Sequence, residues 1–392
     1  MKINRLRLNF LAGVQVDHDI YFSAWNMNGL FKYNPRTEEI KFLRNFSGEE
    51  DIGLHSEAIL YHDSIWFIPR ASERIAIVDL NNLHITYLDL PKDGYRSDEH
   101  IPPIRMKACY TKENNILWIF PFVYKLFLKI DMVEKKIIRV ERNWKANRDA
   151  ASLGIRIENK FWIYRNNNNE IQVLDIISEE SEIVKLKNKK SSYLGIQNIG
   201  NWVVLFPRDW KDGILLLDIC TCEMRMIELD AHGQWYYEYQ ACGEDGDILL
   251  VPYIGNKFIE INIDDGKCGI KILKNINIDK NAYCSTKMNY DNEIWFLSHV
   301  LENPIICYEK QTNKMLYRYM EIKQKKYNED IIDCMERYGV EYSEIADKKV
   351  LSEQEIFLNT FIQYLKRKNY KNQNMSSKLT GDRIYNKLKS EF

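Results

Sequence analysis

Short apolar runs separated by polar turns make up most of the chain, and the clearest run lies at residues 65–68. It consists of two isoleucines around a tryptophan and a phenylalanine, and it is too short for a helix, so it predicts a strand. Further runs with strand character lie at 57–61, 74–79 and 84–88. The segment from 57 to 88 therefore predicts four antiparallel strands, a to d, joined by turns.

This four-strand unit recurs along the chain. A bulky residue marks the middle of strand b at Tyr21, Trp66, Trp118, Trp162, Val204, Leu249 and Trp295. Subtraction of these numbers gives spacings of 45, 52, 44, 42, 45 and 46 residues. A polar residue ends strand c 13 or 14 residues after each marker, at Asn34, Asp79, Asp131, Asp175, Asp218, Asn262 and Glu309. Two markers at a constant distance from each other, repeated about every 40 to 50 residues, predict the blades of a β-propeller.

The predicted fold class is all-β, a seven-bladed β-propeller of four-stranded antiparallel blades within residues 1–320. The blades are expected at about 13–45, 54–90, 104–142, 150–187, 192–229, 235–274 and 282–319. Residues 2–10 are expected to form an extra strand. The strand b marker should fill the space between neighbouring blades, and the strand c marker should accept hydrogen bonds from turn amides.

The character of the sequence changes at about residue 320, and residues 321–392 are expected to form a helical C-terminal extension. Ser352 and Glu355 have the spacing of a capping box at the start of a helix. An apolar stripe follows at Ile356, Phe357, Phe361, Ile362 and Leu365. Because such a stripe needs cover, it is expected to pack on the propeller or to bind a partner.

Composition narrows the class of protein. The net charge of −1 gives no bulk attraction to nucleic acid or to an anionic membrane. No secretory signal and no run of eighteen apolar residues is seen, so no membrane span is predicted. The eight cysteines form no CxxC pair, and most fall in predicted strands. They are interpreted as buried thiols in a reducing compartment, which predicts a cytoplasmic protein without a metal site or cofactor.

The pattern of strands b, c and d, as at residues 29–41, resembles the kelch-type repeat, in which a strand that ends in Asp or Asn-Pro is followed by a turn and another strand. The resemblance covers residues 13–319, but the paired glycines of the kelch repeat are absent. Gly-His and Trp-Asp signatures are absent as well. The resemblance implies a divergent, kelch-like propeller. That family includes protein-binding scaffolds, sugar-binding modules and a few enzymes, so the fold does not choose among them.

The loops expected at one rim of the ring, between strands b and c and between successive blades, are rich in arginine and aromatic residues. The predicted binding residues are Trp25, Arg70, Arg148, Arg165, Arg208, Trp210, Trp235, Tyr253 and His299. Such residues are typical of recognition surfaces, and guanidinium groups bind carboxylates or phosphates in a bidentate way. In the alternative interpretation, the recurring Pro-Arg pair is structural, with the proline ending strand b and the arginine pairing with an acid on the next blade.

Three functional hypotheses follow. The first is a non-catalytic recognition module that binds a protein, peptide or glycan on this rim. The second is an enzyme of lyase or hydrolase type, with catalytic candidates His55, Glu57 and Arg105. No P-loop, Rossmann, HExxH or GxSxG motif supports it, although propeller enzymes assemble residues from distant blades. The third is a scaffold whose helical tail binds the partner.

Overall fold

The computed structural model of the chain describes most of the repeat region. The described residues are 5–49, 53–92, 106–111, 115–121, 127–140, 152–165, 169–186, 193–207, 212–228, 236–242, 247–254, 257–264, 267–275, 286–298, 304–309, 311–312 and 314–323. The chain divides into two compact units, residues 1–98 with 103–339, and residues 99–102 with 340–392. All described residues belong to the first unit. Among them, no helix has the length and apolarity needed to cross a membrane.

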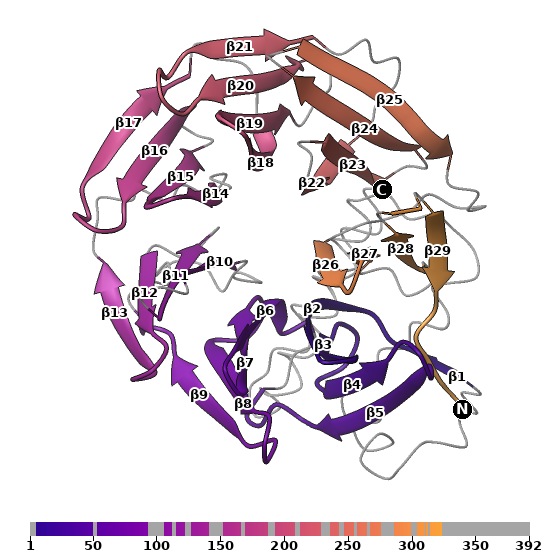
Figure 1. Ribbon diagram of the computed structural model, residues 1–392. Helices are drawn as coiled ribbons and strands as arrows, with labels where there is room; N and C mark the ends of the chain where they lie inside the picture. Colours follow the sequence, from indigo (N-terminus) through magenta and orange to yellow (C-terminus); the bar gives the residue numbers. More distant parts are fainter. Residues whose placement is uncertain are drawn as a thin grey trace, which may run out of the picture. The chain divides into compact units, whose positions relative to one another are not determined.

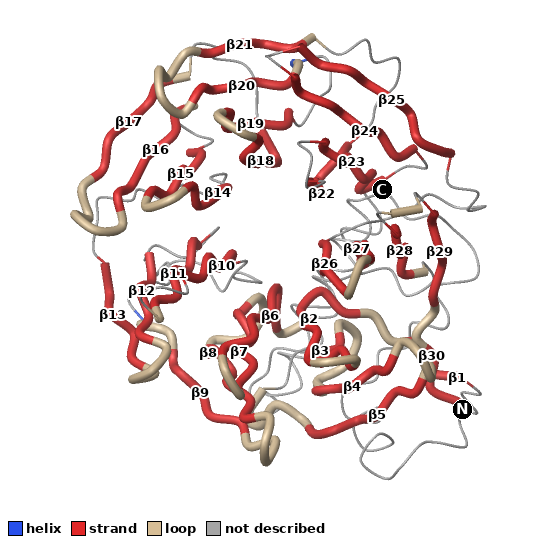
Figure 2. The backbone as a smooth tube through the Cα atoms, viewed as in Figure 1, coloured by secondary structure: helices blue, strands red, loops and turns tan. Residues whose placement is uncertain are grey.

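The described strands form seven four-stranded antiparallel sheets (Figures 1 and 2). The first sheet contains β2 (Phe10–Val16), β3 (Asp19–Ala24), β4 (Leu30–Asn34) and β5 (Glu39–Arg44), and the second contains β6 (His55–Tyr61), β7 (Ser64–Pro69), β8 (Arg74–Asp79) and β9 (Ile85–Asp89). The third sheet contains β10 (Met106–Thr111), β11 (Ile116–Pro121), β12 (Phe127–Asp131) and β13 (Lys136–Val140). The fourth contains β14 (Ser152–Ile157), β15 (Lys160–Arg165), β16 (Glu170–Asp175) and β17 (Ser181–Lys185). The fifth sheet contains β18 (Tyr193–Ile199), β19 (Trp202–Pro207), β20 (Ile214–Asp218) and β21 (Met224–Ile227). The sixth contains β22 (Tyr236–Cys242), β23 (Asp247–Ile254), β24 (Lys257–Asp264) and β25 (Lys267–Asn275). The seventh contains β26 (Thr286–Tyr290), β27 (Glu293–Leu297), β28 (Ile305–Glu309) and β29 (Lys314–Arg318).

Each sheet lies beside the next one in the sequence. The first strands β2, β6, β10, β14, β18, β22 and β26 contact one another in this order, and β26 contacts β2. Within a sheet the strands follow in sequence order, so the first and fourth strands are its two edges. This is the arrangement of a β-propeller, and the prediction of an all-β propeller with four-stranded antiparallel blades is confirmed.

Two of the strand b markers, Trp66 and Trp295, lie between sheets, as predicted. Trp66 on β7 is fully buried in one apolar cluster with Leu117 and Ile130 of the following sheet. Trp295 on β27 packs in the same way with Phe22 and other residues of the first sheet. Because both faces of each sheet are apolar, burial against the two neighbouring sheets is what stabilises a unit that could not fold alone.

The strand c markers end their strands and hold the following turn. The side-chain oxygens of Asn34, Asp131, Asp175 and Asp218 each accept hydrogen bonds of 2.8 to 3.0 Å from two backbone N–H groups of the turn. These bonds lower the pKa of Asp175 and of Asp218. The sixth sheet differs, because Asn262 lies inside β24 and its pairing with β25 continues to Asp264 and Lys267.

The boundary predicted at residue 320 is wrong by a few residues. Residues Glu321–Lys323 form a strand, β30, which pairs with β1 (Arg5–Arg7) in a separate two-stranded sheet. Residues 321–323 are therefore strand rather than helix. Their backbone groups form hydrogen bonds with β1, in place of the internal hydrogen bonds of a helix. The first sheet also begins at Phe10 rather than at residue 13. Residues 324–392, with the predicted helices, lie outside the described residues.

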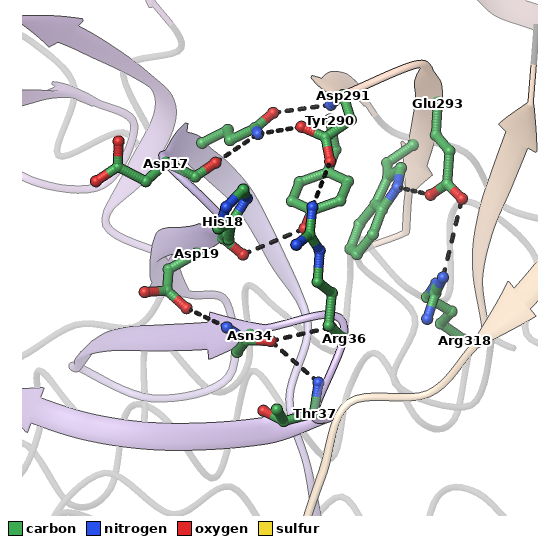
Figure 3. A network of polar contacts seen from close by, with 12 residues as sticks. Asp17, His18, Asp19, Asn34, Arg36, Thr37, Tyr290, Asp291, Glu293 and Arg318 are labelled. Carbon is green, nitrogen blue, oxygen red and sulfur yellow. Dashed lines mark hydrogen bonds and ion pairs between the residues drawn. The ribbon is translucent and has the colours of Figure 1, made fainter.

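Polar contacts join the first sheet to the last (Figure 3). Gln15 and Asp291 form a reciprocal pair, in which the Asp291 N–H donates to Gln15 Oε1 at 2.9 Å and Gln15 Nε2 donates to Asp291 Oδ1 at 2.6 Å. The Tyr290 hydroxyl donates to the carbonyl of His18 at 3.2 Å. Residues almost three hundred positions apart in sequence thus hold neighbouring turns together.

Candidate recognition site between the first two sheets

The turns that follow β3 and β7 bring two predicted binding residues together. Trp25 directly follows β3, and Arg70 directly follows β7. The Arg70 guanidinium carbon lies 4.0 Å from the centroid of a Trp25 ring, which is a close cation–π contact. The structure therefore places this arginine and this tryptophan at one end of neighbouring sheets, where the sequence predicts a shared rim.

The segment before β6 holds the guanidinium in place. Arg70 has only 8% of its surface exposed, and its Nη1 lies 3.5 Å from the Gly53 carbonyl, which accepts the hydrogen bond. The Arg70 N–H donates to the carbonyl of Leu54 at 2.7 Å. Gly53 has φ +60°, and a Cβ there would lie 3.0 Å from the Trp25 ring and 3.2 Å from Arg70 Nη1. Only glycine fits this position without displacing the stacked pair.

Hydrogen bonds from a buried asparagine hold the segment that connects the first two sheets. Asn28 Nδ2 donates to the carbonyls of Phe46 at 3.0 Å and Glu49 at 2.6 Å, and Asn28 Oδ1 accepts from the Phe46 N–H at 2.9 Å. The side chain thus pairs with the backbone as a neighbouring strand would.

The Glu49 carboxylate accepts hydrogen bonds from Ser72 at 2.7 Å and from Arg74 at 3.0 Å, and burial raises the pKa of its carboxyl group. The rim is therefore held in one conformation by buried polar groups.

His55, a catalytic candidate, has a structural setting. It opens β6 with 2% of its surface exposed, and its Nδ1 lies 2.8 Å from Ser23 Oγ on β3. Its ring packs against Phe46 and Phe67, with centroids 4.6 and 5.3 Å away. Burial lowers the pKa of His55 to about 3, so the imidazole is neutral at pH 7. This enclosed ring bridges the first two sheets.

The structure describes three of the other candidates, Arg165, Glu57 and Tyr253. Arg165 Nη1 donates to Glu170 Oε1 at 2.9 Å on the adjacent strand of the same sheet. Glu57 follows a β-bulge after His55 and is partly exposed. Tyr253, expected in a turn, lies within β23, so that placement is corrected. Arg105, Arg148, Arg208, Trp210, Trp235 and His299 lie outside the described residues.

The structural role predicted for the prolines is partly correct. Pro69, Pro121 and Pro207 are the last residues of β7, β11 and β19. A proline is suited to a strand end because it cannot donate a ladder hydrogen bond. Pro252 departs from this pattern, because β23 continues to Ile254.

Sequence reasoning named Arg70 and His55 but did not predict that they and other polar residues of the rim are buried. The described buried polar residues are Asn9, Ser23, Asn26, Asn28, His55, Arg70, Ser72, Gln172 and Ser298. All except Gln172 lie at the same end of three neighbouring sheets, the last, the first and the second. The available signal was the run of asparagines in the turn after β3. Among the described residues, no group of three His, Cys, Asp or Glu side chains is placed to hold a metal ion.

No protein-family model matches the chain, and no curated protein matches it in sequence. Solved structures resemble it in fold. A streptogramin B lyase has 14% sequence identity and a TM-score of 0.56, over 76% of this chain and 93% of that chain. A virginiamycin B lyase from Staphylococcus aureus has 16% identity and a TM-score of 0.57, over 76% and 96%. A chain of a mitotic checkpoint complex has 7% identity and a TM-score of 0.54, over 76% and 88%. They share a propeller fold with this chain. At such identities the likeness shows the fold alone.

Proposed function

We propose that this protein is a non-catalytic recognition propeller that binds a protein, peptide or glycan ligand at the rim between its first two sheets. The observation that carries the proposal is the stack of Arg70 on Trp25, built around Gly53 and supported by buried polar residues. Interfaces are enriched in arginine and tryptophan, and here the partly exposed Trp25 is the side chain that a ligand would contact, while the buried Arg70 guanidinium holds the indole ring in place.

The seven sheets are taken to work as one closed ring of seven kelch-like blades. The support is the order of contacts among the first strands and the β1–β30 ribbon that joins both ends of the repeat region. A cytoplasmic location belongs to the same proposal. Its support is that the cysteines with described side chains, Cys220, Cys222 and Cys307, are thiols rather than disulfides.

Binding is favoured over catalysis by the setting of His55. Two of the structural relatives are lyases by name, which keeps an enzymatic role as the alternative hypothesis. The enzyme hypothesis needs His55 at an accessible position beside Glu57, whereas this ring is 2% exposed and bonded to Ser23.

The test is a screen of peptide and glycan arrays with the purified full-length protein, followed by affinity measurement on the hits. Arg70→Lys and Trp25→Leu should each weaken binding by about tenfold or more, since each removes the stacked plane. The matched control is Arg225→Lys, because Arg225 stacks on Trp202 at 5.0 Å within the fifth sheet. It should leave binding unchanged.

Three outcomes would count against the proposal. Binding that survives both rim substitutions but is lost on deletion of residues 324–392 would assign recognition to the C-terminal segment. Turnover of a bound peptide or glycan that is lost in Glu57→Gln would support the enzyme. Equal loss of binding in Arg225→Lys would show that the rim variants act through stability alone.

A further inference from the structure

The hairpin of β24 and β25 departs from the repeat in length. In the six other sheets, the third strand ends at its polar marker, as β4 does at Asn34. In the sixth sheet β24 runs two residues beyond Asn262, and the added pairs are Ile263 with Cys268 and Asp264 with Lys267. The hairpin is therefore a local extension of one sheet and is not required by the propeller plan.

The extension produces the longest outer strand of the described chain. β25 has nine residues, whereas β5, β9, β13, β17, β21 and β29 have four to six. Among the described strands β25 pairs with β24 alone, and it forms the outer edge of its sheet (Figure 1). An edge strand offers a row of backbone N–H and C=O groups that another extended chain can pair with.

The charge of β25 selects the kind of chain that would pair with it. Its sequence contains Lys267, Lys271 and Lys274 and no acidic residue. Edge-to-edge pairing of two copies of this strand would bring together two segments of charge +3, which repel each other. An acidic extended segment has the complementary charge, and its main-chain hydrogen bonds would add to the attraction.

We propose that the outer edge of β25 is a second interaction surface, which receives an extended acidic peptide segment of a partner protein as a fifth strand. The surface is separate from the rim at Trp25 and Arg70, and the proposal does not depend on the recognition function of that rim. A strand of about seven to nine residues buries little area, so the complex is expected to be transient, with a dissociation constant on the order of micromolar.

The test uses the full-length protein and a fluorescent nine-residue peptide of alternating glutamate and valine. Fluorescence anisotropy should show saturable binding, and substitution of Lys267, Lys271 and Lys274 by Gln should weaken it by about tenfold or more. The control is Lys136→Gln with Arg139→Gln on the shorter outer strand β13, which should bind as the natural protein does. A control peptide with the same charge, but with two valines replaced by proline, should bind at least about tenfold more weakly because it cannot form a strand.

Hydrogen exchange provides a measurement that needs no variant. Saturating glutamate-valine peptide should slow the exchange of backbone amides in residues 267–275 by about fivefold or more, since a paired edge is protected from solvent. Absence of binding would overturn the proposal and would mean that these lysines instead prevent the edge from pairing. Equal binding of the proline peptide would also overturn it, because attraction would then be electrostatic without strand pairing.

Discussion

At the scale of single residues, Ser23 and His55 occupy a pair of positions that recurs between successive sheets. The corresponding pair at the contact between the fourth and fifth sheets is Tyr164 and Tyr193, whose rings lie 5.4 Å apart. Only the first contact in this comparison contains an imidazole. The neutral form of His55 is favoured there because burial among phenylalanines penalises the charged imidazolium, and one ring nitrogen lies within hydrogen-bond distance of Ser23.

Acidification should therefore destabilise the contact between the first two sheets. The pKa of His55 is about 3 in the folded protein and about 6.5 when unfolded, so the unfolded state takes up the proton first. The stabilisation is fully present above pH 6.5 and is lost as the pH falls toward 3. At pH 5 the loss from this group is about 2 kcal/mol. Urea unfolding at pH 7 and pH 5 measures it.

The double variant Ser23→Ala with His55→Leu should lack this component of the pH dependence, since it removes the titrating group and its hydrogen-bond partner together. The exposed histidine at position 84 supplies the control, His84→Gln, which should keep the full pH dependence. A natural protein that is equally stable at pH 5 and pH 7 would contradict the burial of a neutral His55.

Gly53 should be more sensitive to substitution than Gly200, another glycine with positive φ. Gly53→Ala adds a Cβ at 3.0 Å from Trp25, in addition to the strain of φ +60°. We expect a loss of about 2 to 3 kcal/mol of unfolding free energy. Gly200→Ala has a similar φ of +51° but no atom within 4 Å of the added Cβ, so it should lose only about 1 kcal/mol. Equal losses in thermal or urea unfolding would mean that packing around Gly53 is not tight.

At the scale of elements, the turns between the third and fourth strands repeat one backbone conformation. The same place in five of these turns is occupied by Glu38, Leu83, Lys135, Glu179 and Cys222, with φ of 56°, 59°, 50°, 60° and 57°. This left-handed region disfavours residues with a Cβ. The turns therefore keep a conformation that their own residues do not favour, because the preceding marker and the two paired strands impose it.

Lys135→Gly should stabilise the protein by about 0.5 to 1 kcal/mol, since glycine adopts this φ without strain. Lys136→Gly, one residue later and at the start of β13, should instead destabilise it by about 0.5 to 1 kcal/mol, because glycine weakens a strand. Both side chains are exposed, so lost packing does not obscure the comparison. Chemical unfolding of the two variants measures the difference, and a destabilised Lys135→Gly protein would contradict the assigned conformation.

At the scale of the whole unit, the contact between the first and last sheets has to join segments from opposite ends of the repeat region. Apolar residues of both sheets share one buried cluster, and the Gln15–Asp291 pair links their turns (Figure 3). The outermost sheets of a linear array each lack one neighbour, and this contact supplies it.

A double-mutant cycle of Gln15→Ala and Asp291→Ala should give a coupling free energy of about 1 kcal/mol, since the Gln15 amide donates a hydrogen bond to the Asp291 carboxylate. The exposed Lys160–Glu182 pair, at 3.7 Å within the fourth sheet, should give less than about 0.5 kcal/mol. Urea unfolding of the four proteins of each cycle measures both values. Additive effects at Gln15 and Asp291 would show that this pair does not help to join the sheets.

The repeat markers made most of the fold predictable, because they are local. A bulky residue such as Trp66 in an apolar run and an Asp or Asn at the end of the next strand specify one hairpin, whatever the rest of the chain does. The candidate site was predictable only in part. That Trp25 and Arg70 follow equivalent strands could be read from their positions, but their burial and their dependence on Gly53 could not.

The sequence by itself determined the strand pattern, the order of the strands within each sheet and the end of the sheets at which Trp25 and Arg70 lie, since these depend on interactions between near neighbours in the chain. Only the tertiary structure decided that Arg70 is stacked and buried, that His55 bridges two sheets, and that Gln15 meets Asp291. Those facts depend on how neighbouring sheets approach each other, and contacts between distant segments leave no periodic signal in a single sequence.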